Sequence, residues 1–290
     1  MSKKILITGA TGLIGKEAIP FLLNKGYEVY AISAEALKSE AVKFIQCDLC
    51  DFDSLKKTVE MVKPECLLHF AWITGGDYLT NPQNTALKEA SENLLRLFAE
   101  NGGKRAVFAG TCFEYDIDGK ILTEESRINP KTLYAQTKNE LHEFCEKYSK
   151  DNNISFGWGR IFYVFGHGEK SSRLTAAIID SLKNDKEFNI GAPENYLDYM
   201  YTKDIASAFV AFLENSYEGS VNICTGKGIL LKDYGLKIQE LIGKQNLIKF
   251  NNSKSPALKV VGDNTILRTV IGFNPKYTVE SGLREVIKEI

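Results

Sequence analysis

The sequence lacks an excess of charge of either sign. Its 36 lysine and arginine residues balance 37 aspartate and glutamate residues, which leaves a net charge of -1. Such a chain has no overall field that would attract a nucleic-acid backbone or an anionic membrane surface. We therefore expect neither a nucleic acid nor a membrane among its partners, and any anionic ligand must be held by local groups.

Long apolar runs are also missing. The run from Leu67 to Ile73, which includes His69, falls far short of the roughly 20 residues that a membrane-spanning helix needs. The first residues lead directly into the first apolar segment, without the separate apolar region and small-residue cleavage site of a secretory signal. These features predict a cytoplasmic protein.

Disulfide and metal-binding patterns are absent from the sequence as well. The six cysteines and three histidines are scattered through 290 residues: Cys47, Cys50, Cys66, Cys112, Cys145, Cys224, His69, His142 and His167. Cys47-Asp-Leu-Cys50 has the spacing of half a zinc site, but no second pair completes a tetrahedral set of ligands. We expect reduced thiols and no metal.

What the sequence does contain is an alternation of short apolar segments with amphipathic ones. At 44% apolar and 25% charged residues, the composition is that of an ordinary globular protein. Strands are predicted at Lys4 to Thr8, Glu28 to Ser33, Phe44 to Cys47, Cys66 to Ala71, Ala106 to Gly110 and Ile154 to Ile161, and helices at Gly12 to Asn24, Asp53 to Val62, Ala86 to Asn101 and from Pro130 to Ser149. This pattern predicts an α/β fold with a Rossmann-type, doubly wound parallel sheet.

The second half of the chain is less regular. Residues 168–190 have a helical, charged pattern, residues 219–225 a strand pattern, and residues 231–290 mix helices with turn-forming residues. We assign residues 1–165 to an NAD(P)-binding domain, joined by a returning strand and helix near 196–225. Residues 166–195 and 226–290 are predicted to form a smaller C-terminal α/β lobe that binds the substrate.

Three glycines follow the first predicted strand, where the first helix begins. Gly9, Gly12 and Gly15 lie three residues apart. Glycine lets the backbone approach a pyrophosphate closely, and a helix N-terminus offers free N–H groups and a partial positive charge. The turn therefore predicts a bound dinucleotide, with a tight turn that holds no ligand as the alternative. The expected contacts are Gly9, Thr11, Gly12, Leu13, Ile14 and Gly15.

The end of the second predicted strand indicates which dinucleotide binds. An acidic residue there would hydrogen-bond the ribose 2′-hydroxyl and repel a 2′-phosphate, but the sequence has the neutral Ser33. This favours NADP(H), with NAD(H) also possible, and Lys38 lies close in the sequence. Asp48 and Leu49, after the third strand, are expected to contact the adenine; a simple turn is the alternative role for Asp48.

Tyr134-Ala-Gln-Thr-Lys138 places a phenol and an ammonium on one face of a predicted helix. A nearby ammonium stabilises a phenolate, which lowers the tyrosine pKa toward the working range of a general acid or base. Thr111 ends a predicted buried strand, so its hydroxyl would emerge at the carboxyl edge of the sheet, where open α/β sheets bind ligands. These three residues are the candidate catalytic groups.

In this order along the chain, the glycine turn, Asp48-Leu49, Thr111, Tyr134 and Lys138 resemble the extended short-chain dehydrogenase/reductase family, in particular its nucleotide-sugar-modifying branch. Further matching segments begin at His69, Arg160, Tyr199 and Gly272, so the resemblance covers nearly the whole chain. It implies that Tyr134 is the catalytic acid/base, Lys138 its partner and ribose anchor, and Thr111 the hydroxyl that holds the reacting oxygen. It also implies that Phe70, Ala71 and Trp72 line the cofactor site.

Positions at which this chain departs from the family pattern help to distinguish among the reactions that the family catalyses. Dehydratases of this family carry an Asp-Glu pair directly after the catalytic threonine, whereas Cys112 and Phe113 follow Thr111 here. Glu114 lies one place too far along, which argues against a dehydratase. Deoxyhexose epimerase-reductases have a cysteine where this chain has Phe113, and Cys112 is expected to be a core thiol.

The pattern is closest to that of reductases of nucleotide-linked 4-keto-6-deoxyhexoses. We expect hydride transfer from NADPH to a sugar keto group, because the neutral Ser33 suits a dissociable NADPH. A nucleotide-sugar 4-epimerase with bound NAD is the alternative, and a dinucleotide-binding sensor without turnover a more remote one. Substrate contacts are expected from Thr111, Phe113, Tyr134, Tyr163, Arg173 and Arg268, although Tyr163 replaces an asparagine of the family. The resemblance also suggests a homodimer formed through the helix of Tyr134 and the helix at Ala86 to Asn101.

Overall fold

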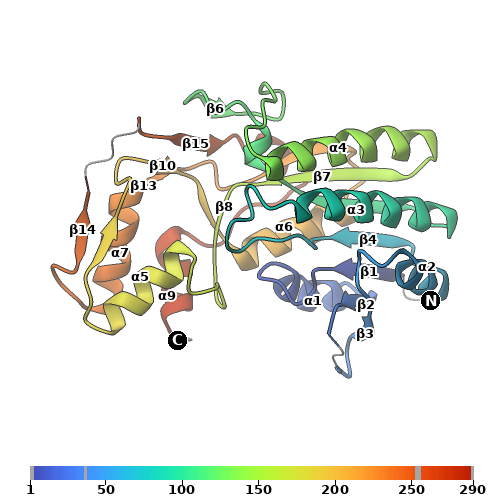
Figure 1. Ribbon diagram of the computed structural model, residues 1–290, viewed down its shortest axis with the longest axis horizontal. Helices are drawn as coiled ribbons and strands as arrows, with labels where there is room; N and C mark the ends of the chain where they lie inside the picture. The colour runs from blue at the N-terminus through green and yellow to red at the C-terminus, as the bar shows by residue number, and fades with distance from the viewer. Residues whose placement is uncertain (1–2, 36–37, 252–255, 289–290) are drawn as a thin grey trace.

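The computed structural model describes residues 3–35, 38–251 and 256–288, and at its centre lies a seven-stranded parallel sheet (Figure 1). The strand order is β12-β7-β5-β4-β1-β2-β3. The order reverses between β1 and β4, as in a doubly wound sheet, so a crevice is expected at the carboxyl ends of these two strands. The strands are β1 (Lys4–Thr8), β2 (Glu28–Ser33), β3 (Lys43–Gln46), β4 (Cys66–His69), β5 (Arg105–Thr111), β7 (Ser155–Ile161) and β12 (Gly219–Ile223).

Helices cover both faces of this sheet, so there are two hydrophobic cores, one on each face. Successive residues of a strand point alternately into one core and the other. Ile5 and Ile7 of β1 pack under α1 (Gly15–Asn24) and α6 (Thr202–Glu214), whereas Leu6 packs on the opposite face. This alternation follows from the two-residue period of a strand, and it explains why strands buried on both faces are apolar throughout. The opposite face is covered by α2 (Phe52–Val62), α3 (Gln83–Glu100) and α4 (Leu133–Asp151).

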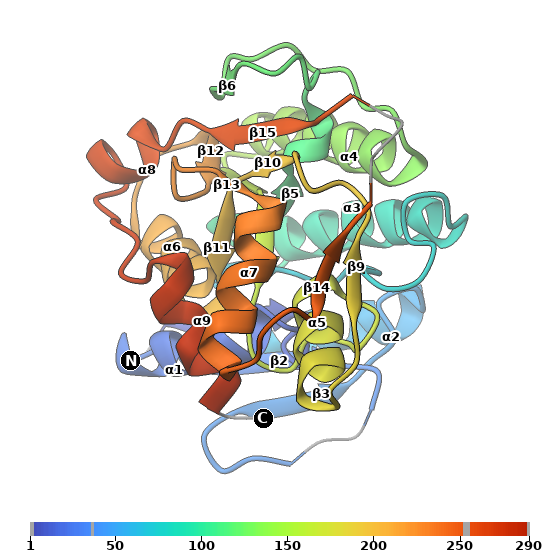
Figure 2. The same cartoon turned by 90° about the vertical axis from the view of Figure 1, so that its left-hand side faces the viewer.

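A third core holds the smaller lobe together, at one end of the sheet (Figure 2). The lobe contains a four-stranded sheet of order β13-β10-β15-β6 and the parallel pairs β8–β11 and β9–β14. An α/β Rossmann-type fold with a smaller α/β lobe is thus confirmed. The elements are η1 (Cys112–Glu114), β6 (Ile121–Leu122), β8 (Tyr163–Phe165), α5 (Leu174–Lys183), β9 (Phe188–Ile190), β10 (Tyr196–Leu197), β11 (Tyr199–Tyr201), β13 (Ile229–Leu230), α7 (Leu231–Ile242), β14 (Ile248–Phe250), β15 (Lys259–Gly262), α8 (Thr265–Thr269) and α9 (Val279–Lys288).

Two expectations about individual elements need correction. The first helix begins at Gly15 rather than Gly12, because Gly12 closes a turn by donating its N–H to the carbonyl of Gly9. Residues 168–190 are not helical throughout: α5 is followed by the strand β9, which pairs with the distant β14. In the part of the chain that the structure describes, no helix is both long and apolar enough to cross a membrane.

Candidate active site

Most of the predicted site residues lie around the carboxyl ends of β1, β4 and β5. The ends of β1 and β4 are joined by Thr8, whose hydroxyl lies 2.8 Å from His69 Nδ1 and accepts the N–H of Ala71 at 3.2 Å. The other ring nitrogen of His69 lies 2.9 Å from the hydroxyl of Ser91 on α3. These contacts fix the chain segment that carries Phe70, Ala71 and Trp72 beside the glycine turn.

Thr111, Tyr134 and Lys138 come together at the end of β5. Tyr134 lies in the first turn of α4, which begins there because the Thr132 hydroxyl accepts the N–H of Ala135. The Thr111 hydroxyl lies close enough to the Tyr134 phenol to lower its pKa. One helical turn further on, Lys138 Nζ donates to the carbonyl of Ala109 at 2.8 Å and lies 3.7 Å from the centre of the Trp72 ring.

Burial sets the pKa values of this pair. It raises the pKa of the Tyr134 phenol above its usual range, against the effect of the nearby Thr111 hydroxyl. It also lowers the pKa of Lys138 to about 7, and the charge of Glu114 opposes this shift. The expected lowering of the Tyr134 pKa by Lys138 is therefore not seen, because burial has the largest effect and the group that lowers this pKa is Thr111.

Aromatic rings surround the side of the site that faces the smaller lobe. The ring of Tyr78 lies 5.1 Å from that of Tyr134, and the nearby guanidinium of Arg173, at the N-terminus of α5, acts to lower the pKa of the Tyr78 hydroxyl against the larger effect of burial. The ring of Phe113 lies 6.0 Å from that of Tyr163. Arg173 is thereby brought to the site, and so is Tyr78, which the sequence analysis missed because it lies in a loop without a motif.

Arg268 lies elsewhere than the other predicted substrate residues. It is exposed on α8, a short helix that packs against β12 and contributes Leu267 to the core beneath α1 and α6. Within the described ranges, no side-chain hydrogen bond or ion pair joins Arg268 to Thr111, Tyr134 or Arg173. Its proposed contact with substrate stays a prediction.

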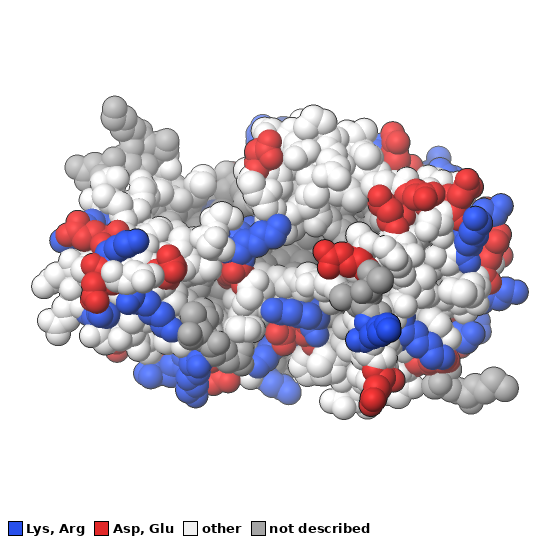
Figure 3. Space-filling view, turned by 60° about the horizontal axis from the view of Figure 1, so that its bottom comes forward, with Lys and Arg blue, Asp and Glu red and all other residues white. Residues whose placement is uncertain are grey.

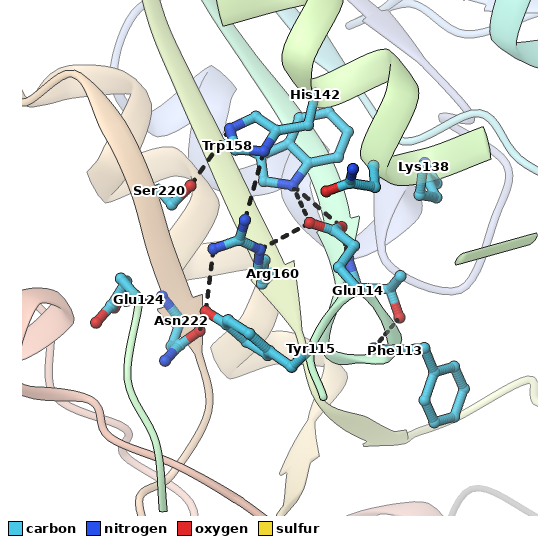
Figure 4. A network of polar contacts seen from close by, with 12 residues as sticks. Phe113, Glu114, Tyr115, Glu124, Lys138, His142, Trp158, Arg160, Ser220 and Asn222 are labelled. Atoms are coloured by element: carbon cyan, nitrogen blue, oxygen red, sulfur yellow. Dashed lines mark hydrogen bonds and ion pairs between the residues drawn. The ribbon is translucent and has the colours of Figure 1, made fainter. Parts of the chain in front are cut away.

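Cys112 and Glu114, which follow Thr111 in the sequence, are both buried. Cys112 is 2% exposed, and burial raises the pKa of its thiol. Glu114 is fully buried, and its carboxylate lies against Trp158 and Arg160 of β7 (Figure 4).

The glycine turn has the shape that a pyrophosphate requires. Gly9 has a φ of +67°, and a Cβ added to it would lie 2.7 Å from the backbone nitrogen of Ala71. A Cβ added to Gly15 would lie 2.1 Å from the carbonyl oxygen of Gly9. Ile14 supplies no side-chain cap to α1, and the N–H groups of Lys16 and Glu17 donate to the backbone carbonyls of Gly12 and Ile14. These residues fit a dinucleotide.

Comparison with known proteins shows to which family this chain belongs. The family model described as "NAD dependent epimerase/dehydratase family" matches residues 5–224, which is most of the chain. The protein belongs to this NAD-dependent epimerase/dehydratase family. The predicted membership of the nucleotide-sugar-modifying branch of the extended short-chain dehydrogenases/reductases is thereby confirmed.

Relatives of this family member act on nucleotide-linked sugars, as their names state. It is 28% identical to a dTDP-6-deoxy-L-talose 4-dehydrogenase (NAD(+)) of Aggregatibacter actinomycetemcomitans, over 84% of this chain and 91% of the relative. It is 22% identical to a CDP-abequose synthase of Salmonella typhimurium, over 100% and 99% of the two chains. The crystal structure of a UDP-glucose 4-epimerase from Thermotoga maritima has the same fold, with a TM-score of 0.90 and 21% identity over 98% and 97% of the chains.

In this NAD-dependent epimerase/dehydratase family member, the predicted adenosine contacts lie at the ends of β2 and β3. Ser33 is 8% exposed, and its hydroxyl accepts the N–H of Glu35 at 3.2 Å. Asp48 is exposed, and its carboxylate accepts the N–H of Cys50 at 2.9 Å, so it does form the turn that was the alternative role for it. Leu49 is buried in the core under α2 and α3.

A hollow separates the two lobes on one face of the molecule (Figure 3). Basic and acidic side chains both lie at its rim. The glycine turn contacts the smaller lobe through Lys16 of α1, whose Nζ donates to the carbonyl of His167 at 2.7 Å. The ammonium group of a second lysine, Lys170, lies next to Gly75 in the loop after β4, because a Cβ added to Gly75 would be only 3.0 Å from it. The helix that follows the glycine turn is thus in direct contact with the smaller lobe.

Proposed function

We propose that the protein reduces the 4-keto group of a nucleotide-linked 6-deoxyhexose, with NADPH as the hydride donor. The observation that carries this proposal is the single acid/base group at the reacting position. Tyr134 lies beside Thr111, whereas burial raises the pKa of the Cys112 thiol and the Glu114 carboxylate is engaged by Trp158 and Arg160. Reduction of a ketone needs one hydride and one proton, so one acid suffices, whereas elimination of water needs further acid/base groups.

Each of the three candidate catalytic residues has its own role in the proposed reduction. When bound, the reduced nicotinamide supplies a hydride to the carbonyl carbon of the sugar. Tyr134 gives its proton to the carbonyl oxygen, and Thr111 donates a hydrogen bond to that oxygen as charge develops on it. Lys138, in its charged form, stabilises the phenolate that remains on Tyr134.

The position of the keto group and the choice of cofactor rest on separate observations. Two relatives are named as 4-dehydrogenases of 6-deoxytaloses, and the reverse of such a reaction is reduction at the 4-position. The neutral Ser33 at the end of β2 supports NADP(H). NAD(H) is the alternative, since one of these relatives is named as an NAD(+) enzyme.

We expect the nucleotide part of the substrate to bind on the side of the site that faces the smaller lobe. Phe113 and Tyr163 offer ring surface for the sugar, and the guanidinium of Arg173, next to Tyr78, is the candidate partner of the diphosphate. Arg268 is a second candidate. The homodimer expected through α3 and α4 stays a prediction, which the mass of the protein in solution checks.

A 4-epimerase is the second candidate, because the same observation suits it. Oxidation and reduction of one carbon by a tightly held NAD also needs a single acid/base group, and Tyr134 could serve in both directions. The two proposals differ in the fate of the cofactor. A reductase consumes NADPH, whereas an epimerase regenerates its NAD in every cycle.

The test offers the protein NADPH with a panel of nucleotide-linked 4-keto-6-deoxyhexoses and follows the absorbance of reduced nicotinamide. We expect NADPH oxidation by the wild type and by the control Tyr148→Phe, which lies at the far end of α4. Tyr134→Phe should lower the rate by about a hundredfold or more.

Two results would overturn the proposed reduction. The first is interconversion of unoxidised sugar nucleotides without NADPH consumption, which would establish an epimerase. The second is dinucleotide binding without turnover of any sugar, which would indicate a sensor.

A further inference from the structure

A continuous set of polar side chains extends from Glu114 through Arg160 and Tyr115 to Asn222 (Figure 4). Its centre is the carboxylate of Glu114, which accepts the backbone N–H of Thr111 at 2.8 Å. The indole N–H of Trp158 lies 3.1 Å from both carboxylate oxygens, and Arg160 Nε donates to one of them at 2.7 Å. The carboxylate thus receives donors from its own turn and from β7, and one of them belongs to the backbone of a catalytic residue.

The guanidinium of Arg160 is held from its other side. Its Nη1 donates to the Tyr115 hydroxyl at 3.1 Å, and its Nη2 lies 3.4 Å from His142 Nδ1. Tyr115 in turn donates to Asn222 of β12 at 2.7 Å. The ion pair therefore has a fixed direction, with Glu114 toward the catalytic residues and Arg160 toward Tyr115.

This ion pair is poorly explained by stability alone. Glu114 and Arg160 have side chains that are 0% and 4% exposed. A fully buried pair commonly adds no stability over apolar residues of similar volume, because both charges lose their hydration. The hydrogen bond between Glu114 and the backbone of Thr111 points instead to a role in the candidate active site.

Lys138 is the group that such a charge would affect. Its amine is buried beneath the rings of Trp72 and Trp158, whose centres lie 3.7 Å and 5.9 Å away, and it donates to a neutral carbonyl. Burial favours the uncharged amine, and the negative charge of Glu114 favours the ammonium.

The other titratable groups around Lys138 do not supply that charge. His69 of β4 is held neutral because burial lowers its pKa, and Cys145 of α4 stays a thiol because burial raises its pKa. Tyr134, on the same helix, is a neutral phenol for the same reason. From β7, Arg160 faces Glu114 rather than the amine. Glu114 is therefore the anion whose charge favours the protonated form of Lys138.

We propose that Glu114 is a positioning residue for the catalytic pair: it fixes the backbone of Thr111, and its negative charge, held in place by Arg160, keeps Lys138 protonated. This inference rests on the proposed role of Tyr134 and Lys138 in proton transfer. It assigns the ion pair a function in the reaction that the sequence motifs did not show.

The test measures the protonation of Lys138 directly, in the full-length protein without cofactor or substrate. Lysine labelled with ¹³C at Cε reports the charge of each amine by NMR, and a Lys138→Met variant identifies the signal of Lys138. Glu114→Gln keeps the size and an oxygen acceptor for Thr111 but removes the charge. We expect it to lower the titration midpoint of Lys138 by about one pH unit or more.

Arg160→Gln provides the opposite change, because it leaves Glu114 negative and still bonded to Thr111 and Trp158. We expect it to raise the midpoint of Lys138. Tyr115→Phe is the matched control, since it removes a neutral hydroxyl from the same network, and it should leave the midpoint unchanged. In activity assays, the alkaline limb of the kcat profile should move with these midpoints.

Three outcomes contradict the role of Glu114. They are a folded Glu114→Gln protein with the midpoint of the wild type, shifts of the same sign in the Glu114 and Arg160 variants, and, if Glu114→Gln does not fold, no upward shift in Arg160→Gln. Failure of the proposed function is distinguishable from these. Midpoints that move as expected in a protein that reduces no keto sugar would remove the reaction and leave the electrostatic role of Glu114 intact.

Discussion

Lys138 shows how burial changes the chemistry of a single residue. The spacing of Tyr134 and Lys138 predicts that they share a helix face, and the structure places both beside Thr111. The spacing does not predict that burial lowers the pKa of the lysine to about 7. That effect comes from Trp72 and the strands packed around the amine, which are distant in the sequence.

Cofactor choice can be tested at Ser33. The variant Ser33→Asp would place a carboxylate at the end of β2, where it repels a 2′-phosphate and accepts a hydrogen bond from a 2′-hydroxyl. We expect the ratio of KM for NADPH to KM for NADH to rise by about tenfold or more, as a charge repulsion of a few kcal/mol near the surface implies. The two KM values measured with one keto sugar give the answer, and an unchanged ratio would place the ribose away from Ser33.

The glycine turn gives a second prediction for a single residue. Gly9→Ala puts a Cβ 2.7 Å from the backbone of Ala71, whereas at Gly26, which also has a positive φ, a Cβ would meet nothing within 4 Å. Both variants lose the conformational freedom of glycine, but only the first also creates an overlap. We expect Gly9→Ala to lower the free energy of unfolding by about 1 to 3 kcal/mol more than Gly26→Ala. Urea denaturation without cofactor measures the difference, and equal losses would refute the steric argument.

Elements of the central sheet could be predicted because each strand is a short apolar run between helical segments. The strands of the smaller lobe could not, because they have two to four residues and pair with distant partners, as β9 does with β14. The same limit applies to the site. Thr111, Tyr134 and Lys138 carry a motif, whereas Tyr78 and the partners of Glu114 are brought in by loop and strand packing that no local pattern encodes.

Helix α1 contains Pro20, which lacks the N–H of an intrahelical hydrogen bond, yet the helix runs from Gly15 to Asn24. Pro20 is exposed, so its replacement removes no core packing. We expect Pro20→Ala to raise the free energy of unfolding by about 1 to 3 kcal/mol. The control Lys57→Ala, exposed on α2, should change it by less than about 0.5 kcal/mol. Chemical denaturation of both variants tests this, and no gain from Pro20→Ala would mean that the helix is adapted to the proline.

Across the whole molecule, buried polar contacts connect parts that are far apart in the sequence. Arg105 of β5 donates to the carbonyl of Phe212 on α6 at 2.8 Å. Asn222 of β12 accepts from Tyr115 and donates to the carbonyl of Leu122 at 2.9 Å. Buried titratable groups also link the stability of the molecule to pH, because their pKa values differ between the folded and the unfolded state.

His142 provides a measurable part of that link. Burial lowers its pKa from 6.5 to about 3, so the folded state holds it neutral while the unfolded chain binds a proton below 6.5. The stability that it contributes is present above this value and is lost as the pH falls. The carboxyls of Glu169 and Asp198 act in the opposite sense, because burial raises their pKa values to about 7 and about 6.

A comparison of variants separates the histidine from these carboxyls. Between about pH 6 and about pH 4, the unfolding free energy of the wild type should fall by about 1.4 kcal/mol per pH unit more than that of His142→Gln. Urea denaturation at several pH values measures both slopes. Parallel slopes would mean that His142 is protonated in the folded protein.

In the proposed reaction, a hydride passes from the nicotinamide to the 4-position of a sugar while Tyr134 supplies the proton. The most direct measurement uses NADPH that carries deuterium at both C4 positions of the nicotinamide, with product analysis by NMR. We predict that deuterium appears at C4 of the sugar ring, and that this transfer is lost in Tyr134→Phe and retained in Tyr148→Phe. A sugar product without deuterium, or with deuterium in Tyr134→Phe at the rate of the wild type, would contradict the account.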